Sequence, residues 1–178
     1  MLIKPVMKVF VYAGVVIGLL ASNAAVAEEA SDGWYIEAQY FVVDADVVDL
    51  DALGIAIGKE VLDYLAVEVV LGSGFNEEKF SQFGSVATAE IDNYYGLVVK
   101  PNIDVGRVNL FLDLGYIDIS SNASVTGYGQ YVSLSDSDSV FMFGAGADID
   151  FTDKLYGSIG YIDIDEAGGL QVGIGYRF

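Results

Sequence analysis

Acidic side chains dominate the residues of this sequence that could do chemistry. There are 26 Asp and Glu residues against 8 Lys and Arg, and His and Cys are both absent. Catalytic triads built on His, disulfides and most transition-metal sites are thereby excluded, because each needs one of these two residue types. Two carboxylates could still act as acid and base. The acids are scattered with no recognisable pairing, so we expect no enzyme activity, no catalytic residue, no cofactor and no dedicated metal site.

One group of charged residues lies within otherwise apolar segments and is predicted to point into the interior of the fold. Charges away from water are costly unless they are paired, so ion pairs are expected among them. The network has two interpretations, a gate or simply the polar filling of a narrow interior, and we favour the filling. Its members are Glu37, Glu60, Glu68, Asp113 and Asp148, with Lys100 and Arg177 as cationic partners.

A second group of acids lies on or beside the segments predicted to be long loops. Carboxylate oxygens are natural Ca²⁺ ligands, so these loops could bind divalent cations. The alternative, which we favour, is a solvated and self-repelling rim. The excess of negative charge argues against a nucleic-acid partner, whose phosphates need Lys and Arg. The group comprises Asp44, Asp46, Asp49, Asp51, Glu77, Glu78, Glu90, Asp92, Asp118, Asp136, Asp138, Asp163, Asp165 and Glu166.

The first 27 residues have the organisation of an export signal. Lys4 and Lys8 precede an apolar stretch over 9–21, which is too short to cross a membrane as a helix. Ala25 and Ala27 then form an A-x-A cleavage site. We therefore divide the chain into a signal peptide, 1–27, and one domain, 28–178.

The domain alternates apolar and small or polar residues with the period of β-strands. In 65–72, Leu65, Val67, Val69 and Leu71 share one face, while the other face carries Ala66, Glu68, Val70 and Gly72. The final segment alternates in the same way, and glycine at positions 173 and 175 disfavours a helix.

Eight such runs are predicted, at 34–43, 52–61, 64–73, 89–100, 107–119, 139–150, 154–163 and 169–178. Short connections at 62–63, 101–106 and 151–153 alternate with longer ones at 44–51, 74–88, 120–137 and 164–168. This rhythm is typical of an all-β, eight-stranded, antiparallel up-and-down transmembrane barrel, in which the short turns and both termini share the periplasmic side. A mean hydropathy of +0.46 together with a net charge of -18 suits a barrel with lipid around its middle and water at both ends.

Aromatic residues are expected at the two membrane interfaces. Trp34, Tyr64, Phe151, Tyr176 and Phe178 fall at one set of strand ends, and Tyr40, Tyr95, Tyr116 and Tyr161 at the other. A soluble ligand-binding barrel would instead keep its outside polar and its apolar face inside.

The sequence resembles the OmpA/OmpX-like outer-membrane β-barrel families. The resemblance rests on Gly33-Trp34-Tyr35, on Leu65-Ala66-Val67-Glu68 and on the ending Gly173-Ile174-Gly175-Tyr176-Arg177-Phe178. It implies a bacterial outer-membrane location and contact with lipid and lipopolysaccharide. It also implies insertion by the outer-membrane assembly machinery, with Tyr176 and Phe178 as the recognition signal.

Two functions of different classes remain at this stage. The first is a structural or surface-interaction role, with acidic outer loops and a lumen plugged by polar side chains. The second is a small, cation-preferring, porin-like channel for ions or polar solutes. Eight strands leave an interior just wide enough for side chains, which favours the first.

We predict that the exported protein begins at Glu28, because the A-x-A site follows a short apolar stretch. N-terminal sequencing and intact-mass analysis of protein purified from membranes should both report this residue. Recovery of a chain that still carries Met1 would contradict the export signal.

Overall fold

The computed structural model describes residues 33–45, 48–74, 78–82, 85–127, 130–165 and 167–178. The predicted signal segment, with Ala25 and Ala27, lies outside the described residues, so its cleavage stays a prediction. Within the described ranges, no helix is long and apolar enough to cross a membrane.

The described chain folds into nine antiparallel strands. Eight of them close into a barrel because β3 pairs with β5 as well as with β2, which leaves the short β4 outside the ring. The eight-stranded antiparallel barrel predicted from the sequence is thus confirmed. The strands are β1 (Trp34–Ala45), β2 (Val48–Leu62), β3 (Leu65–Gly74), β4 (Glu78–Gln82), β5 (Ser85–Val105), β6 (Val108–Gly127), β7 (Gln130–Asp150), β8 (Leu155–Ile164) and β9 (Ala167–Arg177).

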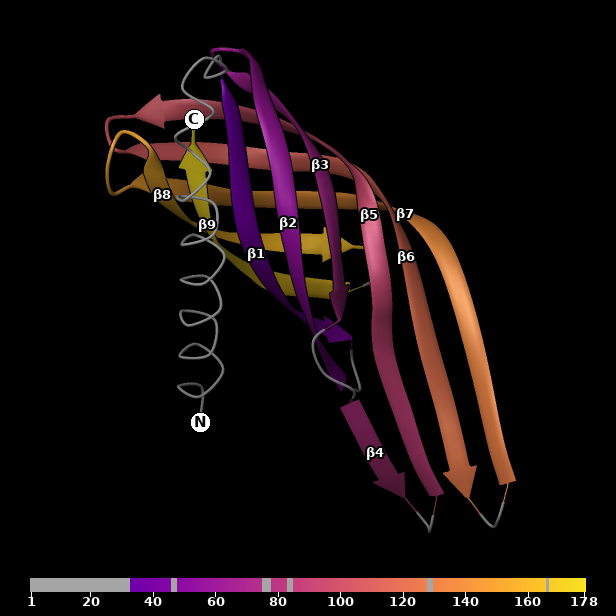
Figure 1. Cartoon of the computed structure of the whole chain (residues 1–178). Helices are drawn as coiled ribbons and strands as arrows, with labels where there is room; N and C mark the ends of the chain where they lie inside the picture. The colour runs from indigo at the N-terminus through magenta and orange to yellow at the C-terminus, as the bar shows by residue number, and fades with distance from the viewer. Residues whose placement is uncertain (1–32, 46–47, 75–77, 83–84, 128–129, 166) are drawn as a thin grey trace.

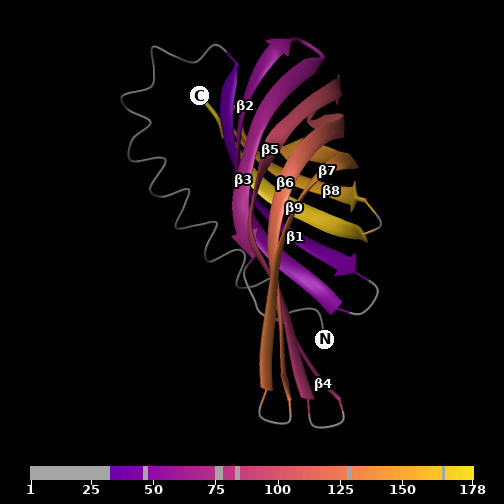
Figure 2. The ribbon, with the colours of Figure 1, turned by 90° about the vertical axis from the view of Figure 1, so that its right-hand side faces the viewer.

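The barrel has two different ends (Figure 1). At one, which we call the terminal end, β1 begins and β9 finishes beside it, and short turns join β2 to β3, β5 to β6 and β7 to β8. The β5–β6 turn has Gly106 at a φ of 73°. At the other, the extension end, β5, β6 and β7 continue past the barrel and are joined by β4 (Figure 2).

The predicted alternation is borne out residue by residue in β3. Ala66, Glu68 and Val70 are buried inside the barrel, while Val67 and Val69 are exposed on its outer surface. Other strands carry the same apolar outer surface, with exposed Leu97 on β5 and exposed Leu112 on β6. Because a bilayer, unlike water, favours such a surface, the sequence can place its large apolar residues outward.

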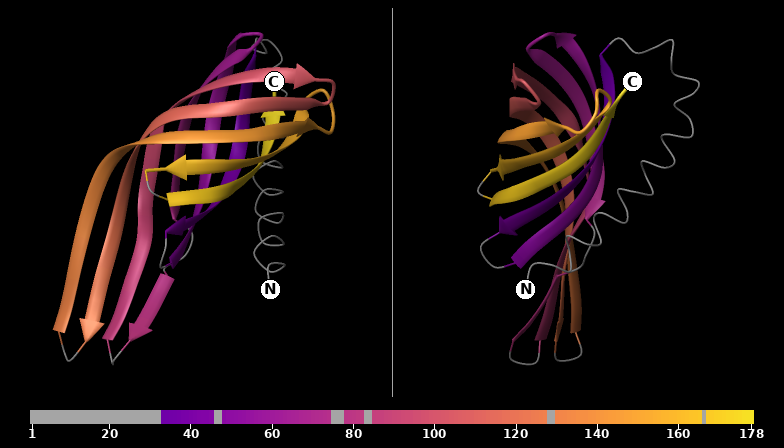
Figure 3. Two further views of the ribbon diagram at one scale, coloured as in Figure 1. Left: turned by 180° about the vertical axis from the view of Figure 1, so that it is seen from behind. Right: turned by 90° about the vertical axis from the view of Figure 1, so that its left-hand side faces the viewer.

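The extension corrects the expectation of long loops at 74–88 and 120–137. Most of these residues instead form β4 and the outer parts of β5, β6 and β7, a sheet that continues beyond the barrel (Figures 2 and 3). One face of this sheet carries polar side chains that pair across strands. Ser135 donates to Asn122 at 2.6 Å, and Ser120 lies 3.1 Å from Ser137. The other face carries exposed Val125, Val132 and Leu134. Ser121 and Asp136 interrupt this apolar face, so the alternation is too short to predict strands from the sequence alone.

Aromatic residues occupy the rims largely as expected. Trp34, Tyr64 and Phe151 are exposed at the terminal end. Tyr95, Tyr116 and Tyr161 are exposed toward the other end of the barrel. Tyr40 is the exception, because its side chain is buried and does not contribute to an exposed girdle.

Candidate functional site

The barrel interior divides into a charged half toward the terminal end and an apolar half toward the extension end. The charged half, here called the charged cluster, contains Glu37 of β1, Glu68 of β3, Lys100 of β5, Asp113 of β6 and Asp148 of β7. Each of these residues is at most 4% exposed. They come from five strands, so closure of the barrel, rather than proximity in sequence, brings them together.

Lys100 is the hub of the charged cluster. Its ammonium lies 3.5 Å from Glu68 Oε1 and 3.5 Å from Asp148 Oδ2, and it therefore links β5 to two other walls of the barrel. The ammonium also lies 3.9 Å from the centroid of the Phe111 ring, close enough for a cation–π interaction. One buried cation thus serves several carboxylates at once.

Two tyrosines extend the cluster toward the terminal end. The Tyr35 hydroxyl donates to Glu68 Oε1 at 2.6 Å, and the Tyr156 hydroxyl donates to Glu37 Oε2 at 2.9 Å. The two rings meet edge to face with centroids 6.4 Å apart. Tyr35 thus shares Glu68 Oε1 with Lys100, whereas Tyr156 serves Glu37, which has no ion pair with the lysine.

Glycines on neighbouring strands make room for these large side chains. A Cβ on Gly58 would overlap the Tyr35 ring, and one on Gly175 would overlap the Tyr156 ring. Gly58 of β2 pairs with Tyr35 of β1, and Gly175 of β9 pairs with Tyr156 of β8. The alternation of glycine in β9 therefore has a packing cause.

Arg177 and Glu60 lie apart from the charged cluster. Arg177 is half-buried at the end of β9, where it donates to Asp150 Oδ1 at 2.5 Å and stacks 4.2 Å from the Tyr156 ring. Glu60 is exposed at the end of β2, beside an irregularity in its pairing with β3. The interpretation of Glu60 as an interior charge is therefore wrong, because its inward register places it where the barrel opens to solvent.

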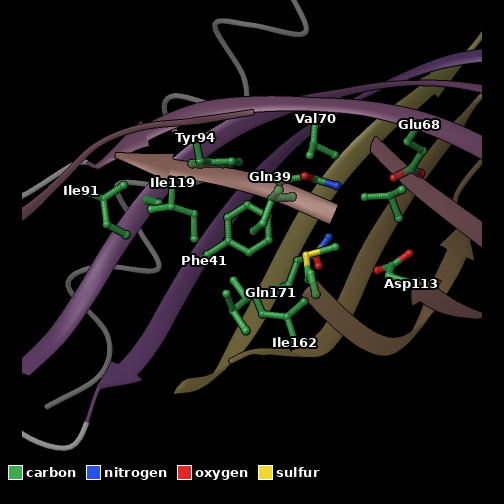
Figure 4. Close-up of a pocket in the computed structure, with 15 residues that line it drawn as sticks. Gln39, Phe41, Glu68, Val70, Ile91, Tyr94, Asp113, Ile119, Ile162 and Gln171 are labelled. Carbon is green, nitrogen blue, oxygen red and sulfur yellow. The ribbon is translucent and has the colours of Figure 1, made fainter. Parts of the chain in front are cut away.

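The apolar half corrects the expectation that polar side chains fill the whole interior. Phe41, Val98, Ile117, Met142 and Ile162 are buried there. They surround a cavity of about 50 Å³ (Figure 4). Sequence alternation could have placed them inward, but inward-facing apolar residues are hard to separate from lipid-facing ones when neighbouring positions on both faces are apolar.

Two interior glutamines were missed by reasoning from charge alone. Gln39 and Gln171 are each 3% exposed and line the cavity where it meets the charged cluster. Gln39 donates to Glu37 Oε1 at 3.3 Å. Each glutamine alternates with outward-facing neighbours on its strand, β1 or β9. This alternation is the sequence signal that predicts an inward-facing position for both.

The acids predicted for the outer loops gather at the extension end, but several lie on strands. Glu90 and Asp92 belong to β5, Asp118 to β6, and Asp136 and Asp138 to β7. Asp44, Asp46, Asp49, Glu77, Glu78 and Glu166 have side chains outside the described set. Among the described residues, no group of three or more potential ligands is arranged to hold a metal ion.

The aromatic residues proposed as an assembly signal form a pair at the terminal rim. The rings of Tyr176 and Phe178 meet edge to face with centroids 5.6 Å apart. The backbone N–H of Phe178 donates to the carbonyl of Trp34 at 3.0 Å, which fixes the end of the last strand against the first.

The fold and its lipid-facing surface identify the class as a transmembrane β-barrel, and the sequence assigns the family. Residues 13–178 match the outer membrane protein beta-barrel domain, so the chain belongs to this family. It is accordingly a protein of the bacterial outer membrane. No curated protein matches the chain.

Solved structures of outer-membrane barrels have the same fold. Ail from Yersinia pestis is 19% identical, with a TM-score of 0.55 over 82% of this chain and 97% of Ail. Neisserial surface protein A is 16% identical, with a TM-score of 0.54 over 82% and 97%. The N-terminal barrel of OprF from Pseudomonas aeruginosa is 15% identical, with a TM-score of 0.54 over 83% and 98%.

Replacing the hub of the charged cluster should destabilise the barrel. Removing one partner of a buried ion pair costs about 3–5 kcal/mol, and Lys100→Met leaves the carboxylates of Glu68 and Asp148 without their cation. Urea titration in micelles should show this loss of stability. The folded fraction is measured from the gel mobility of unheated samples. Lys154→Met, at an exposed lysine, is the matched control. Equal midpoints for both variants would contradict a structural role for the cluster.

Proposed function

We propose that this chain is a structural and surface-interaction protein of the outer membrane with a lumen plugged by its own side chains. The charged cluster is the observation that carries the proposal. It gathers buried charges from five strands, and its single lysine forms ion pairs with carboxylates on two of them. The role proposed is non-catalytic.

The extension end is proposed to face outward. Outer-membrane barrels keep short turns and both termini on the periplasmic side, which corresponds to the terminal end here. The extension would then project from the membrane as the part of the protein that meets its surroundings. The polar face of its strands suits contact with water and with the polar part of lipopolysaccharide.

The acidic residues of the extension end determine which kind of ligand this surface can bind. One solved structure of Ail contains a heparin analogue, which is a polyanion. Asp92, Asp136, Asp138 and Asp163 of this chain are exposed and would repel such a ligand. We propose that these carboxylates keep the rim solvated, and that contact with the phosphates of lipopolysaccharide needs a bridging divalent cation.

The alternative function is a small cation-preferring channel. It is favoured by the composition of the charged cluster, in which four carboxylates face one ammonium. The cavity in the apolar half brings solvent-sized space close to that cluster. We rank this alternative second because the interior of an eight-stranded barrel has little room beyond its own side chains.

The two functions separate in planar-bilayer recordings. Wild-type protein should show no open state or rare small ones, because ion pairs at an effective dielectric of about 20 attract by about 4 kcal/mol at 4 Å. Lys100→Met, which leaves only acids in the charged cluster, should raise a cation-selective leak, whereas Lys154→Met should not. A large and stable wild-type conductance would refute the plugged lumen and support the channel.

Assembly is proposed to depend on the aromatic pair at the end of β9. Burial of one Phe is worth about 1.5–3 kcal/mol, too little to abolish a barrel. Phe178→Asp should nevertheless lower the amount in the outer membrane severely, because the assembly machinery would no longer recognise the strand. The same variant refolded from urea should still form the heat-sensitive barrel. Wild-type membrane levels of Phe178→Asp would disprove the signal.

A further inference from the structure

The cavity in the apolar half of the barrel has a polar floor and apolar walls. Glu68, Asp113, Gln39 and Gln171 line it where it meets the charged cluster. Figure 4 shows the carboxylates of Glu68 and Asp113 at one end of the cavity, with Phe41, Tyr94 and Ile91 toward the other. The space is therefore amphiphilic, with a charged end and an apolar end.

Three polar atoms on this lining have no hydrogen-bond partner among the described residues. They are Gln39 Oε1, the Tyr94 hydroxyl and Asp113 Oδ1. These residues are 3%, 8% and 4% exposed, respectively. An unpaired buried polar group is destabilising, so each such atom in a native protein calls for a partner. All three residues line one cavity, and a molecule held inside it would supply the partner for Gln39 Oε1 and Asp113 Oδ1.

The charge of the lining determines whether the bound molecule is a cation or an anion. Glu68 already accepts from Tyr35 and pairs with Lys100, whereas Asp113 Oδ1 has no hydrogen-bond partner among the described residues. The two free acceptors, Gln39 Oε1 and Asp113 Oδ1, both require a donor. A cationic donor satisfies them and offsets the excess of carboxylates, while an anion would be repelled.

The volume of the cavity limits the size of the bound molecule, and the apolar walls require the part away from the carboxylates to be apolar. Since one water needs about 10–15 Å³, a cavity of about 50 Å³ has room for only a few heavy atoms. Phe41, Val70, Val98, Ile117 and Ile162 would surround the part away from the carboxylates. Ile91, Ile119 and Ile164 are half-buried on the extension side, where such a molecule would enter.

We propose that the apolar half of the lumen binds a small cationic amphiphile of the short alkylammonium class. The ammonium donates to Asp113 Oδ1 and Gln39 Oε1, and the alkyl chain lies against Phe41 and its apolar neighbours. This site borders the charged cluster and shares Asp113 with it, but Lys100 is not part of the cavity lining. It does not require ions to pass through the barrel.

Met142 provides a direct reporter, because it lines the cavity and is the only methionine after residue 7. The protein would be labelled at its methionine methyl groups, purified from membranes and placed in lipid nanodiscs. Its signal is assigned by its loss in Met142→Leu. Titration with n-butylammonium chloride should shift this signal to saturation. Sodium chloride at equal ionic strength should not move it.

The charged head and the alkyl chain are tested separately. n-Butanol, which has the same chain without the charge, should bind at least about tenfold more weakly. Asp113→Asn should reduce the affinity for n-butylammonium to that for n-butanol, while Asp104→Asn, at an exposed acid of the terminal rim, should not. Ala52→Leu narrows the cavity and should weaken binding of both probes.

Several outcomes would overturn the proposal. A Met142 signal that n-butylammonium moves no more than sodium chloride does would show that the cavity holds water only. Equal responses to n-butylammonium and n-butanol would remove the cationic preference. An unchanged response in a folded Ala52→Leu barrel would place the probe in the lipid instead of the cavity. Because the wild-type titration needs no variant, a misfolded substitution leaves the test decisive.

Discussion

Every backbone N–H and C=O group in a bilayer must find its partner within the protein, and this constraint underlies the whole structure. A sheet can meet it only by closing, because an open edge would leave unpaired groups in hydrocarbon. Here the closing ladder is the pairing of β3 with β5, which bypasses the short β4. Closure also gives each strand two environments, lipid outside and a narrow lumen inside. The period-two sequence pattern follows directly from that division.

Closure of a narrow barrel then forces its interior to be filled. Large inward residues need small ones beside them, which accounts for Gly58 next to Tyr35 and Gly175 next to Tyr156. Charges that point inward must be paired within the same small space, and Lys100 meets this need by contacting both Glu68 and Asp148. The cluster and its glycines are thus two consequences of one geometric restriction.

The interior is not uniform along the barrel axis. Toward the terminal end it is charged and closely hydrogen-bonded, whereas toward the extension end it is apolar and encloses a cavity. The three unpartnered polar atoms lie on the lining of that cavity. A barrel serving only as a membrane anchor has no need of this division. We therefore regard the apolar half as the part of the lumen available for a ligand.

Beyond the membrane the constraint on the backbone is relaxed, because water can serve unpaired groups. The extension of β4 to β7 uses this freedom, with polar side chains on one face and exposed apolar ones such as Val132 and Leu134 on the other. The sequence predicts loops here because the apolar alternation is short and is interrupted at Ser121 and Asp136. Glu60 illustrates the same effect at the other end: its inward register was predictable, but its exposure beyond the packed interior was not.

The sequence by itself determined the barrel, its strand number and the outward-facing apolar surface. These follow from a local period, which is readable wherever one face is apolar and the other is small or polar. Tertiary structure alone decided which interior charges meet and where the interior becomes apolar. Lys100, Glu68 and Asp148 lie on β5, β3 and β7, so their contacts depend on register and on closure around the ring. The period of a single strand encodes neither the register nor the closure of the barrel, because both arise from the way the strands pair.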